Sequence, residues 1–352
     1  MAVSIPPKLQ QAAVVQDPGP NYTISLCEDS PIASPGPNEA LVKLTCSGIC
    51  HSEVRAVRGW GVYNPILGHE GVGVVVAVGS DVSSTLMGER VGFKWLYNAC
   101  QECSVCRKGF FHHCSKQQNV GRHVPGTLQQ YSIADARFLT TIPPGLSDVV
   151  AAPLLCAGLT MAGALAHVDG ELQAGDWIVI SGSGGGLGHL GVQIASRVKK
   201  YRVIAIDSGR EKRDLSLSSG AEVFLDFQTE DVAKRVLELT EEGAHATIVV
   251  PGTKEAFQMA SSLVRNLGHI ICVGLPKNDI ELPISATLCA ARGLTIKGSS
   301  VGSEAQMTDL LQLAVEGVMT PAVEVFPFSD TPQLIRKIEK DEILGRAVVK
   351  IP

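Results

Sequence analysis

The sequence predicts an α/β protein of two domains, one rich in short β-strands and the other built on a doubly wound parallel sheet. The chain has 352 residues, which is long enough for two domains. Residues 11–95 read as short strands broken by turns. A buried strand at 177–180 runs into a glycine-rich loop and a helix, and strands alternate with helices after it. These three observations carry the fold prediction.

The first domain is predicted from three runs of β-forming residues. They are Q-A-A-V-V, A-L-V-K-L-T and G-V-G-V-V-V-A-V-G, which begin at positions 11, 40 and 71. The turn sequence P-G-P occurs twice between the first two runs. Short strands separated by such turns indicate a compact β domain.

The second domain is predicted from a series of buried strands. After W-I-V-I at 177–180, the strand-like runs are Y-R-V-I-A-I-D, A-E-V-F-L-D, A-T-I-V-V, H-I-I-C-V-G-L and L-T-I-K-G-S. Helical stretches alternate with these runs, so we expect six parallel strands in one sheet.

Composition narrows the possible partners and the location of the protein. Hydrophobic residues make up 45% of the chain and charged residues 18%, which fits a well-packed globular protein. The formal net charge of −5 gives no reason to expect nucleic-acid binding, and no basic run suggests a membrane surface. No apolar run reaches the roughly 18 residues of a membrane-spanning helix. The start, M-A-V-S-I-P-P-K, has no targeting pattern, so we expect the cytoplasm and no membrane partner.

Residues of zinc-ligand type lie in two stretches of the sequence. Cys50 closes C-S-G-I-C, and His69 lies in G-H-E-G. A thiolate and a neutral imidazole suit Zn²⁺, and a catalytic zinc has three protein ligands and one open position. Cys156, in A-P-L-L-C-A-G-L-T, is the candidate for the third ligand.

Four further cysteines lie close together in the sequence, with the spacing C-x₂-C-x₂-C-x₇-C. Such clustering in a reducing compartment favours a metal over disulfides. Four thiolates can enclose one tetrahedral zinc and leave no open position, which defines a structural site. An iron–sulfur cluster is the alternative that the spacing leaves open. The residues are Cys100, Cys103, Cys106 and Cys114.

A glycine-rich loop follows the strand 177–180. A strict G-x-G-x-x-G does not fit, because Leu187 lies three positions after Gly184; the pattern that fits places glycines at 182, 185, 186 and 188. Glycines permit a tight turn and let the backbone approach a pyrophosphate at a helix N-terminus. The next strand ends in Asp207, whose carboxylate would accept hydrogen bonds from ribose hydroxyls and repel a 2′-phosphate, which favours NAD.

The motifs G-I-C-H-S, G-H-E-G and P-L-L-C-A-G-L-T, in this order, resemble zinc-dependent medium-chain alcohol dehydrogenases, closest to the yeast and fungal type. The resemblance runs nearly end to end. It implies a GroES-like catalytic domain and a Rossmann dinucleotide-binding domain. The expected limits are 1–158 with 299–352 for the first, including a structural zinc lobe at 98–116, and 159–298 for the second. The resemblance also implies a homotetramer and favours zinc at the four cysteines.

Several site residues follow from the resemblance. Cys50, His69 and Cys156 would hold a catalytic zinc that polarises the substrate oxygen, while hydride passes between an alcohol or aldehyde substrate and NAD. Ser52 would carry the proton of the substrate hydroxyl, and Glu70 would lie behind the metal. The residues expected at the cofactor are His51, Thr160, Gly182, Gly185, Gly186, Leu187, Gly188, Asp207, Lys212, Val273, Val301 and Arg346.

The chain departs from the yeast-type pattern near the first ligand. Arg55 occupies the position where the proton relay of those enzymes ends in a histidine, and a guanidinium cannot act as a base. Glu53 replaces the usual aspartate. The segment before His69 is shortened, and we expect Trp60, Tyr63 and Trp95 to form the wall of the substrate pocket. The shortened segment argues against ethanol as the natural substrate and leaves two alternatives, ethanol or a bulkier primary alcohol or aldehyde of fungal specialised metabolism.

The leading interpretation is a zinc-dependent, NAD-linked alcohol dehydrogenase. One alternative is an NADPH-dependent aldehyde or enoyl reductase of the same superfamily. Asp207 argues against NADPH, and the complete zinc triad argues against the zinc-free enoyl reductases. A non-catalytic nucleotide-binding scaffold is the alternative from another class, and the intact triad with Ser52 argues against it.

Overall fold

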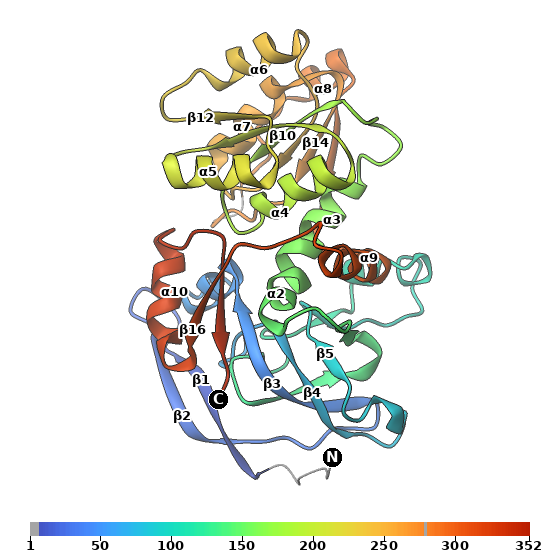
Figure 1. Ribbon diagram of the computed structural model, residues 1–352, viewed down its shortest axis with the longest axis vertical. Helices are drawn as coiled ribbons and strands as arrows, with labels where there is room; N and C mark the ends of the chain where they lie inside the picture. Colours follow the sequence, from blue (N-terminus) through green and yellow to red (C-terminus); the bar gives the residue numbers. More distant parts are fainter. Residues whose placement is uncertain (1–6, 278–279) are drawn as a thin grey trace. The chain divides into compact units, whose positions relative to one another are not determined.

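The computed structural model describes residues 7–277 and 280–352, and its contacts divide the chain into two compact units. Unit 1 comprises Met1–Cys156, Ser303–Val315 and Val323–Pro352; unit 2 comprises Ala157–Gly302 and Glu316–Ala322 (Figure 1). No sequence signal indicates the short return of 316–322 to unit 2. The domain limits expected from the sequence stay a prediction, and each unit is described by itself.

Unit 1 is a β-rich domain. Its main sheet has the strand order β16-β17-β3-β4-β5-β9, with β8 paired to β3, and two smaller sheets pair β1 with β2 and β6 with β7. The strands are β1 (Leu9–Gln16), β2 (Thr23–Pro31), β3 (Glu39–Ile49), β4 (Glu70–Val78), β5 (Arg90–Gly92), β6 (Leu96–Asn98), β7 (Gln118–Asn119), β8 (Tyr131–Asp135), β9 (Thr140–Thr141), β16 (Val323–Pro327) and β17 (Arg346–Lys350). The three β-rich runs expected in this region lie in β1, β3 and β4.

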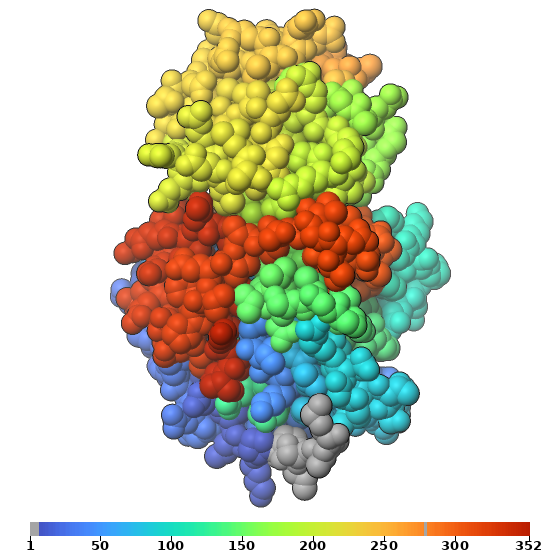
Figure 2. Space-filling model, viewed as in Figure 1, coloured from blue at the N-terminus to red at the C-terminus, as the bar shows by residue number. Residues whose placement is uncertain are grey.

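The C-terminal strand completes the sheet of unit 1. Strand β17 pairs antiparallel with β3 along Ala347–Lys350 and Cys46–Ile49, and β16 pairs parallel to β17. Figure 2 shows the red C-terminal atoms directly against the blue atoms of the N-terminal strands. The side chains of β17 are buried up to Val349, so this pairing joins residues about 300 positions apart into one core.

The helices of unit 1 include α1 (His51–Val57), which follows β3 directly, and α10 (Thr331–Glu339), which packs against α1. The other two are α2 (Asp148–Pro153) and α9 (Glu304–Val315). Helix α1 begins at Cys50, whose backbone N–H donates to Glu53 Oε2 at 2.7 Å. This contact fixes the first turn of α1 at the end of β3.

Residues 148–166 form one continuous helical stretch. Helix α2 passes through a π-helical segment, Leu154–Gly158, into α3 (Leu159–Ala166). The expectation that no stretch is long and apolar enough to span a membrane is wrong for these 19 residues, whose mean hydropathy is 2.0. They are 78% buried inside the protein, so the apolar surface that makes them resemble a membrane span packs in the core.

Unit 2 contains one six-stranded parallel sheet with the order β12-β11-β10-β13-β14-β15. The strands are β10 (Trp177–Ser181), β11 (Arg202–Asp207), β12 (Val223–Asp226), β13 (Ala244–Val249), β14 (Val264–Cys272) and β15 (Thr295–Gly298). Strand β10 is buried on both faces, as its run of apolar residues indicated. The strand order reverses between β10 and β13, where a doubly wound sheet places its ligand.

Helices cover both faces of this sheet. Helix α4 packs against α5, and α6 packs against α7 (Figure 1). The helices are α4 (Gly188–Gln193) with a π-helical continuation Ile194–Val198, α5 (Arg210–Ser219), α6 (Val232–Thr240), α7 (Lys254–Leu263) and α8 (Ala286–Arg292). The predicted six parallel strands and the α/β class are therefore confirmed.

Candidate active site and metal centres

The pairing of β3 with β4 brings Cys50 and His69 together. Gly48 of β3 lies opposite Glu70 of the antiparallel strand β4. Cys50 follows Gly48 by two residues and His69 directly precedes Glu70, so both lie at the same end of this strand pair. A Cβ atom on Gly48 would lie 2.0 Å from Glu70 Oε2, and no other residue than glycine fits there. Two positions 19 apart in the sequence thus meet at one end of the strand pair.

Cys156 reaches the same place from the long helical stretch. It lies in the π-helical segment, eight residues after the stretch begins. A π-turn displaces a side chain from the regular helical register and is frequent at functional sites. Here it turns the Cys156 thiol toward His69, with 3.2 Å between Sγ and Nε2.

The donor atoms of this buried group suit a zinc ion. One ligand atom each from Cys50, His69, Glu70 and Cys156 lies within 4.8 Å of the others. The two sulfur atoms are 4.0 Å apart. Zn–S bonds of 2.3 Å in tetrahedral geometry would separate two sulfurs by roughly 3.8 Å. All four residues of the group are at most 8% exposed, so an ion bound here would be shielded from bulk water.

Glu53 fixes the orientation of the His69 ring. Its Oε1 lies 2.9 Å from His69 Nδ1, while its Oε2 accepts the Cys50 N–H. A proton on Nδ1 that is donated to this carboxylate leaves the Nε2 lone pair facing the two thiols. The longer glutamate side chain is accommodated because the same carboxylate contacts both metal-ligand residues.

Glu70 is fully buried and lies against Arg346. The Nη2 atom of Arg346 donates to Glu70 Oε1. The other carboxylate oxygen, Oε2, has no hydrogen-bond partner among the described residues. Burial raises the pKa of Glu70 to about 7, although Arg346 acts in the opposite direction. Glu70 Oε1 lies 3.9 Å from His69 Nε2, and a buried carboxylate with an unpaired second oxygen in this group fits a cation.

The electrostatics of the group favour a thiolate at Cys50. The Cys156 thiol, which donates toward Cys50 Sγ, holds the pKa of Cys50 well below its usual range, and His69 and Arg346 add to this effect. Thiolate is the form of cysteine that binds metal. The protein therefore prepares the ligand for a metal before one is bound.

Two polar residues follow Cys50 in the first turn of α1. Ser52 is half-buried, with Oγ 3.8 Å from Cys50 Sγ, so its hydroxyl lies beside the ligand group. His51 is exposed, and Arg55 is half-buried one turn later. The structure thus brings Ser52 to the metal ligands, while the expected role of His51 at the cofactor stays a prediction.

Of the three predicted pocket aromatics, Trp95 lies beside His69 and Tyr63 lies beside Trp95. The Trp95 ring stands edge-on to His69, with 5.2 Å between centroids and 80° between planes. Tyr63 follows at 6.5 Å from Trp95. Trp60 lies just after α1, where its backbone N–H donates to Arg55 O, and its role in the pocket stays a prediction.

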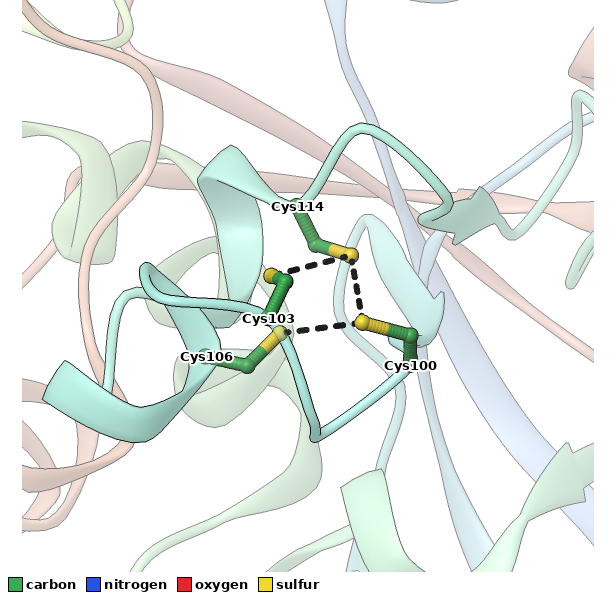
Figure 3. Close-up of side chains that lie close together, drawn as sticks. All are labelled: Cys100, Cys103, Cys106 and Cys114. Carbon is green, nitrogen blue, oxygen red and sulfur yellow. Dashed lines mark hydrogen bonds between the residues drawn. The ribbon is translucent and has the colours of Figure 1, made fainter.

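The four clustered cysteines form a second group with metal-ligand geometry (Figure 3). Their sulfur atoms are 3.5 Å apart for Cys100–Cys114, 3.9 Å for Cys100–Cys106 and 4.0 Å for Cys103–Cys114. Hydrogen bonds from the backbone at Glu102 and Cys103 lower the pKa of Cys100 to about 6. The sulfurs are too far apart for disulfides and at the right spacing for one tetrahedral zinc.

From the sequence, His112 and His113 beside the fourth cysteine are expected to be surface residues of the lobe and not ligands. Neither belongs to the ligand group, but His112 is buried. Its ring packs against Phe110 and His113, with centroid separations of 6.1 and 4.4 Å. The lobe has a small apolar core, in which Cys106 and Cys114 pack with Leu96, Ala99 and Phe138, and Phe111 lies against it.

The glycine-rich loop of unit 2 has the close backbone approaches that its sequence indicated. Gly182 has φ of +69°, and a Cβ on Gly188 would lie 2.0 Å from Gly182 O. Asp207 Oδ2 accepts the Gly184 N–H at 2.9 Å, which joins the end of β11 to the loop. Lys212 Nζ is 3.5 Å from Asp207 Oδ1. The loop, the acidic residue and the lysine are therefore neighbours at the switch point of the sheet.

The other predicted cofactor residues lie in different places. Thr160 and Val273 are buried in unit 2, and Val301 has an unusual φ of +48° for a β-branched residue. A Cβ atom on Gly163 would lie 2.0 Å from the carbonyl oxygen of Val301. Contacts of these residues, and of Gly185, Gly186 and Leu187, with a cofactor stay a prediction.

Sequence reasoning missed the pairing of Arg346 with Glu70. We expected Arg346 at the cofactor phosphates, and the structure places its guanidinium, 4% exposed, on the carboxylate behind the metal ligands. The sequence offered one signal for this pair. A glutamate directly follows a ligand histidine, and a buried glutamate needs an opposite charge beside it.

Comparisons with known proteins agree with this geometry. Residues 36–144 match the model of the alcohol dehydrogenase GroES-like domain, and residues 186–316 match that of the zinc-binding dehydrogenases. An alcohol dehydrogenase of Schizosaccharomyces pombe is 38% identical over 99% of each chain, and alcohol dehydrogenase 2 of Emericella nidulans is 37% identical over 100% of each. The structure of acetophenone reductase from Geotrichum candidum in complex with NAD superposes with a TM-score of 0.86, at 28% identity, over 99% of this chain and 98% of that one.

Full-length relatives at this identity and the two zinc-type groups lead to one assignment. The chain belongs to the zinc-dependent medium-chain alcohol dehydrogenase family and is an oxidoreductase acting on the CH–OH group.

Proposed function

We propose that this chain interconverts an alcohol and its aldehyde or ketone with NAD as cofactor, and that the substrate is bulkier than ethanol. The observation that carries the proposal is the buried group of Cys50, His69 and Cys156, with an aromatic row beside it. The acetophenone reductase whose fold matches is named for an aromatic ketone and was solved with NAD. A bulky substrate for this chain agrees with that likeness.

Each residue of the site in unit 1 has a separate role. A bound zinc would polarise the substrate oxygen, and NAD would accept the hydride. Cys50, His69 and Cys156 would hold the metal, and Glu53 keeps the His69 Nε2 lone pair directed toward the two cysteines. Arg346 neutralises Glu70 and so lowers the cost of a buried carboxylate next to two thiolates.

Ser52 is the residue that moves the substrate proton. Its hydroxyl lies next to Cys50 and is half-buried, so it can accept the hydroxyl proton at Oγ while it passes its own proton outward. Arg55, one turn on, remains charged at any working pH and cannot receive that proton. The path therefore leaves Ser52 through water or through the exposed His51.

Asp207 supports NAD as the cofactor. Its carboxylate is 6% exposed, bonded to the glycine loop and 3.5 Å from Lys212, and a 2′-phosphate at this place would meet its negative charge. The NADPH-dependent reductase is the competing function. The zinc-type group in unit 1 weighs against the zinc-free reductases.

The test is hydride transfer with NADH and with NADPH across aldehydes from acetaldehyde to aromatic ones, with the zinc content of the same sample. We expect two zinc ions per chain and faster turnover with NADH, highest on the larger aldehydes. A strong preference for NADPH, or one zinc per chain, would favour the reductase. Asp207→Asn should raise the NADPH to NADH ratio of kcat/KM about tenfold. The matched control is Asp226→Asn at the end of the neighbouring strand, which should leave that ratio unchanged.

The protein is further proposed to be a cytoplasmic homotetramer. All ten cysteines are free thiols, which suits a reducing compartment. Among the described residues of unit 2, strand β15 pairs only with β14 and no residue of α8 is buried, so this edge of the sheet can pair with a second copy. Light scattering after size exclusion tests the assembly, and a monomer at micromolar concentration would exclude it.

A further inference from the structure

A row of aromatic rings in unit 1 leads outward from His69 to a guanidinium group. Trp95 lies 5.2 Å from the His69 ring and 6.5 Å from Tyr63. The guanidinium carbon of Arg122 lies 5.7 Å from the centre of the Tyr63 ring. The row therefore begins at a metal ligand, continues over two large rings and ends in a positive charge.

The turn that carries Arg122 is anchored next to the metal ligand. A Cβ on Gly121 would lie 2.8 Å from Gly68 O, the carbonyl just before His69. Gly121 O also accepts the Asn64 N–H at 3.2 Å, which joins the turn to the segment of Tyr63. Gly121 has φ of +75°, so both the close approach and the backbone conformation require glycine.

Hydrogen bonds within the turn hold its shape. The Asn119 N–H donates to His123 Nδ1 at 3.0 Å, and Asn119 O accepts from Arg122 N at 3.3 Å and from His123 N at 2.9 Å. The Gly121 N–H donates to Val124 O at 3.0 Å. Arg122 thus extends from a well-defined turn and not from a loose loop.

Arg122, like Arg336 on Tyr22, contacts a tyrosine ring, whereas several arginines of unit 1 pair with acids. The Arg122 side chain is exposed, and no carboxylate of the described residues pairs with it; its contact is the face of Tyr63. Unit 1 pairs four other arginines with acids: Arg58 with Glu339, Arg90 with Asp148, Arg137 with Asp135 and Arg346 with Glu70. Stacking on Tyr63 holds the Arg122 plane but leaves its N–H groups available to a planar acceptor.

We propose that Arg122 binds a carboxylate at the end of the substrate remote from its carbonyl or hydroxyl carbon. The substrate class is then an aldehyde or alcohol with a flat apolar body and a terminal carboxylate. The body packs along Trp95 and Tyr63, and the guanidinium donates two parallel N–H hydrogen bonds to the carboxylate oxygens. The inference rests on the proposed function, since it assigns the substrate class of that same site.

The test compares aldehydes that differ only in their terminal charge. The substrates are 4-carboxybenzaldehyde and 4-carboxycinnamaldehyde, each beside its methyl ester, because two lengths sample the reach of Arg122. The measured quantity is kcat/KM for the acid divided by kcat/KM for its methyl ester, with NADH as the cofactor. We expect a ratio above one in the wild type for one length or both, and a fall of about tenfold in Arg122→Gln.

Three controls isolate the charge of Arg122. Arg122→Lys should recover part of the acid preference because it restores the charge without the planar fork. Lys350→Gln removes the same charge from an exposed position on β17 and should leave the ratio at the wild-type value. The wild-type preference should shrink with added salt, since the site is exposed. A ratio of one or less in the wild type at both lengths, or an equal ratio in wild type and Arg122→Gln, would overturn the proposal.

A binding measurement separates this inference from the proposed function. 4-Carboxybenzamide has an amide in place of the aldehyde and cannot be reduced by hydride transfer here. Calorimetry should give it a dissociation constant about tenfold lower for the wild type than for Arg122→Gln. If no aldehyde is turned over but this difference is found, the proposed function fails and the anion site stands. If the neutral esters are reduced and the difference is absent, only the anion site fails.

Discussion

The two metal centres of unit 1 are built in opposite ways. The four cysteines of the lobe lie within 15 consecutive residues, and two of them, Cys100 and Cys103, are half-buried. The other group draws Cys50, His69 and Cys156 from the end of a strand, the start of another and a π-helical segment, and buries all three. The first is made by a local loop, whereas the second exists only when the sheet and the long helix are in place.

The residues around the two groups also distinguish a structural site from a catalytic one. The lobe has four thiols and no other ligand type, which closes a tetrahedral site. The buried group has an imidazole held by Glu53, a carboxylate with an unpaired oxygen and a hydroxyl, Ser52, at its side. A closed site stabilises a fold, and an incomplete protein ligand set beside a proton carrier performs chemistry.

The largest effect is expected when the buried group loses a ligand. Cys50→Ser should lower kcat/KM about 10³-fold or more, because a metal that polarises the substrate oxygen supplies several kcal/mol to the transition state. Zinc analysis should find one ion per chain in place of two. Retention of two zinc ions with wild-type activity would break the comparison at its first step.

Loss of a lobe ligand should act on stability and not on chemistry. Cys103→Ser removes a ligand that no neighbouring residue replaces in the described part of the lobe, and we expect a loss of about 4 kcal/mol in unfolding free energy. The measurement is thermal and denaturant unfolding with zinc analysis. Activity per molecule that keeps the remaining zinc should stay within about twofold. A variant with normal stability and no activity would reverse the assignment of the two groups.

Glu53 sharpens the comparison, because its carboxylate accepts hydrogen bonds from the Cys50 N–H and the His69 ring of the buried group. Glu53→Gln keeps the length of the side chain and removes its charge, so the catalytic zinc affinity or the activity should fall by about 10- to 100-fold. Competition with a chelator, followed by zinc release over time, measures the effect. Glu53→Asp keeps the charge and should retain more activity than the glutamine variant. Equal zinc loss from both centres would show that Glu53 supports the fold and not one metal.

The smallest effect is expected at the surface of the lobe. Lys116 pairs with Glu102 at 3.2 Å, and both side chains are about 70% exposed or more. Solvent screens such a pair, so Lys116→Gln should leave zinc content and melting temperature unchanged. A clear loss of zinc in this variant would mean that surface charge, and not only the four thiolates, holds the lobe metal.

Local features of the chain were predictable because each depends on residues close in sequence. Runs of β-branched residues predicted the six parallel strands, and the glycine spacing predicted the tight loop after β10. The four-cysteine lobe is predictable for the same reason, since its ligands lie on one short segment. Its buried His112 was not, because its sequence neighbours Phe110 and His113 are exposed and burial of a single side chain depends on tertiary packing.

Features that join distant segments required the tertiary structure. The Arg346–Glu70 pair connects residues 276 positions apart, and it forms because β17 pairs with β3 beside β4. The π-helical turn at Cys156 and the position of Arg122 against Tyr63 likewise depend on what each segment packs against.

By itself the sequence determined the fold class, the ligand types and the cofactor loop, because residue type and spacing decide local conformation and metal chemistry. The tertiary structure alone decided which charges are neutralised and which remain available. The energy of a buried charge depends on the partner that folding brings to it, and for Glu70 that partner is Arg346. At the rim of the aromatic row folding brings no acid to Arg122, and a charge exposed to water does not require one.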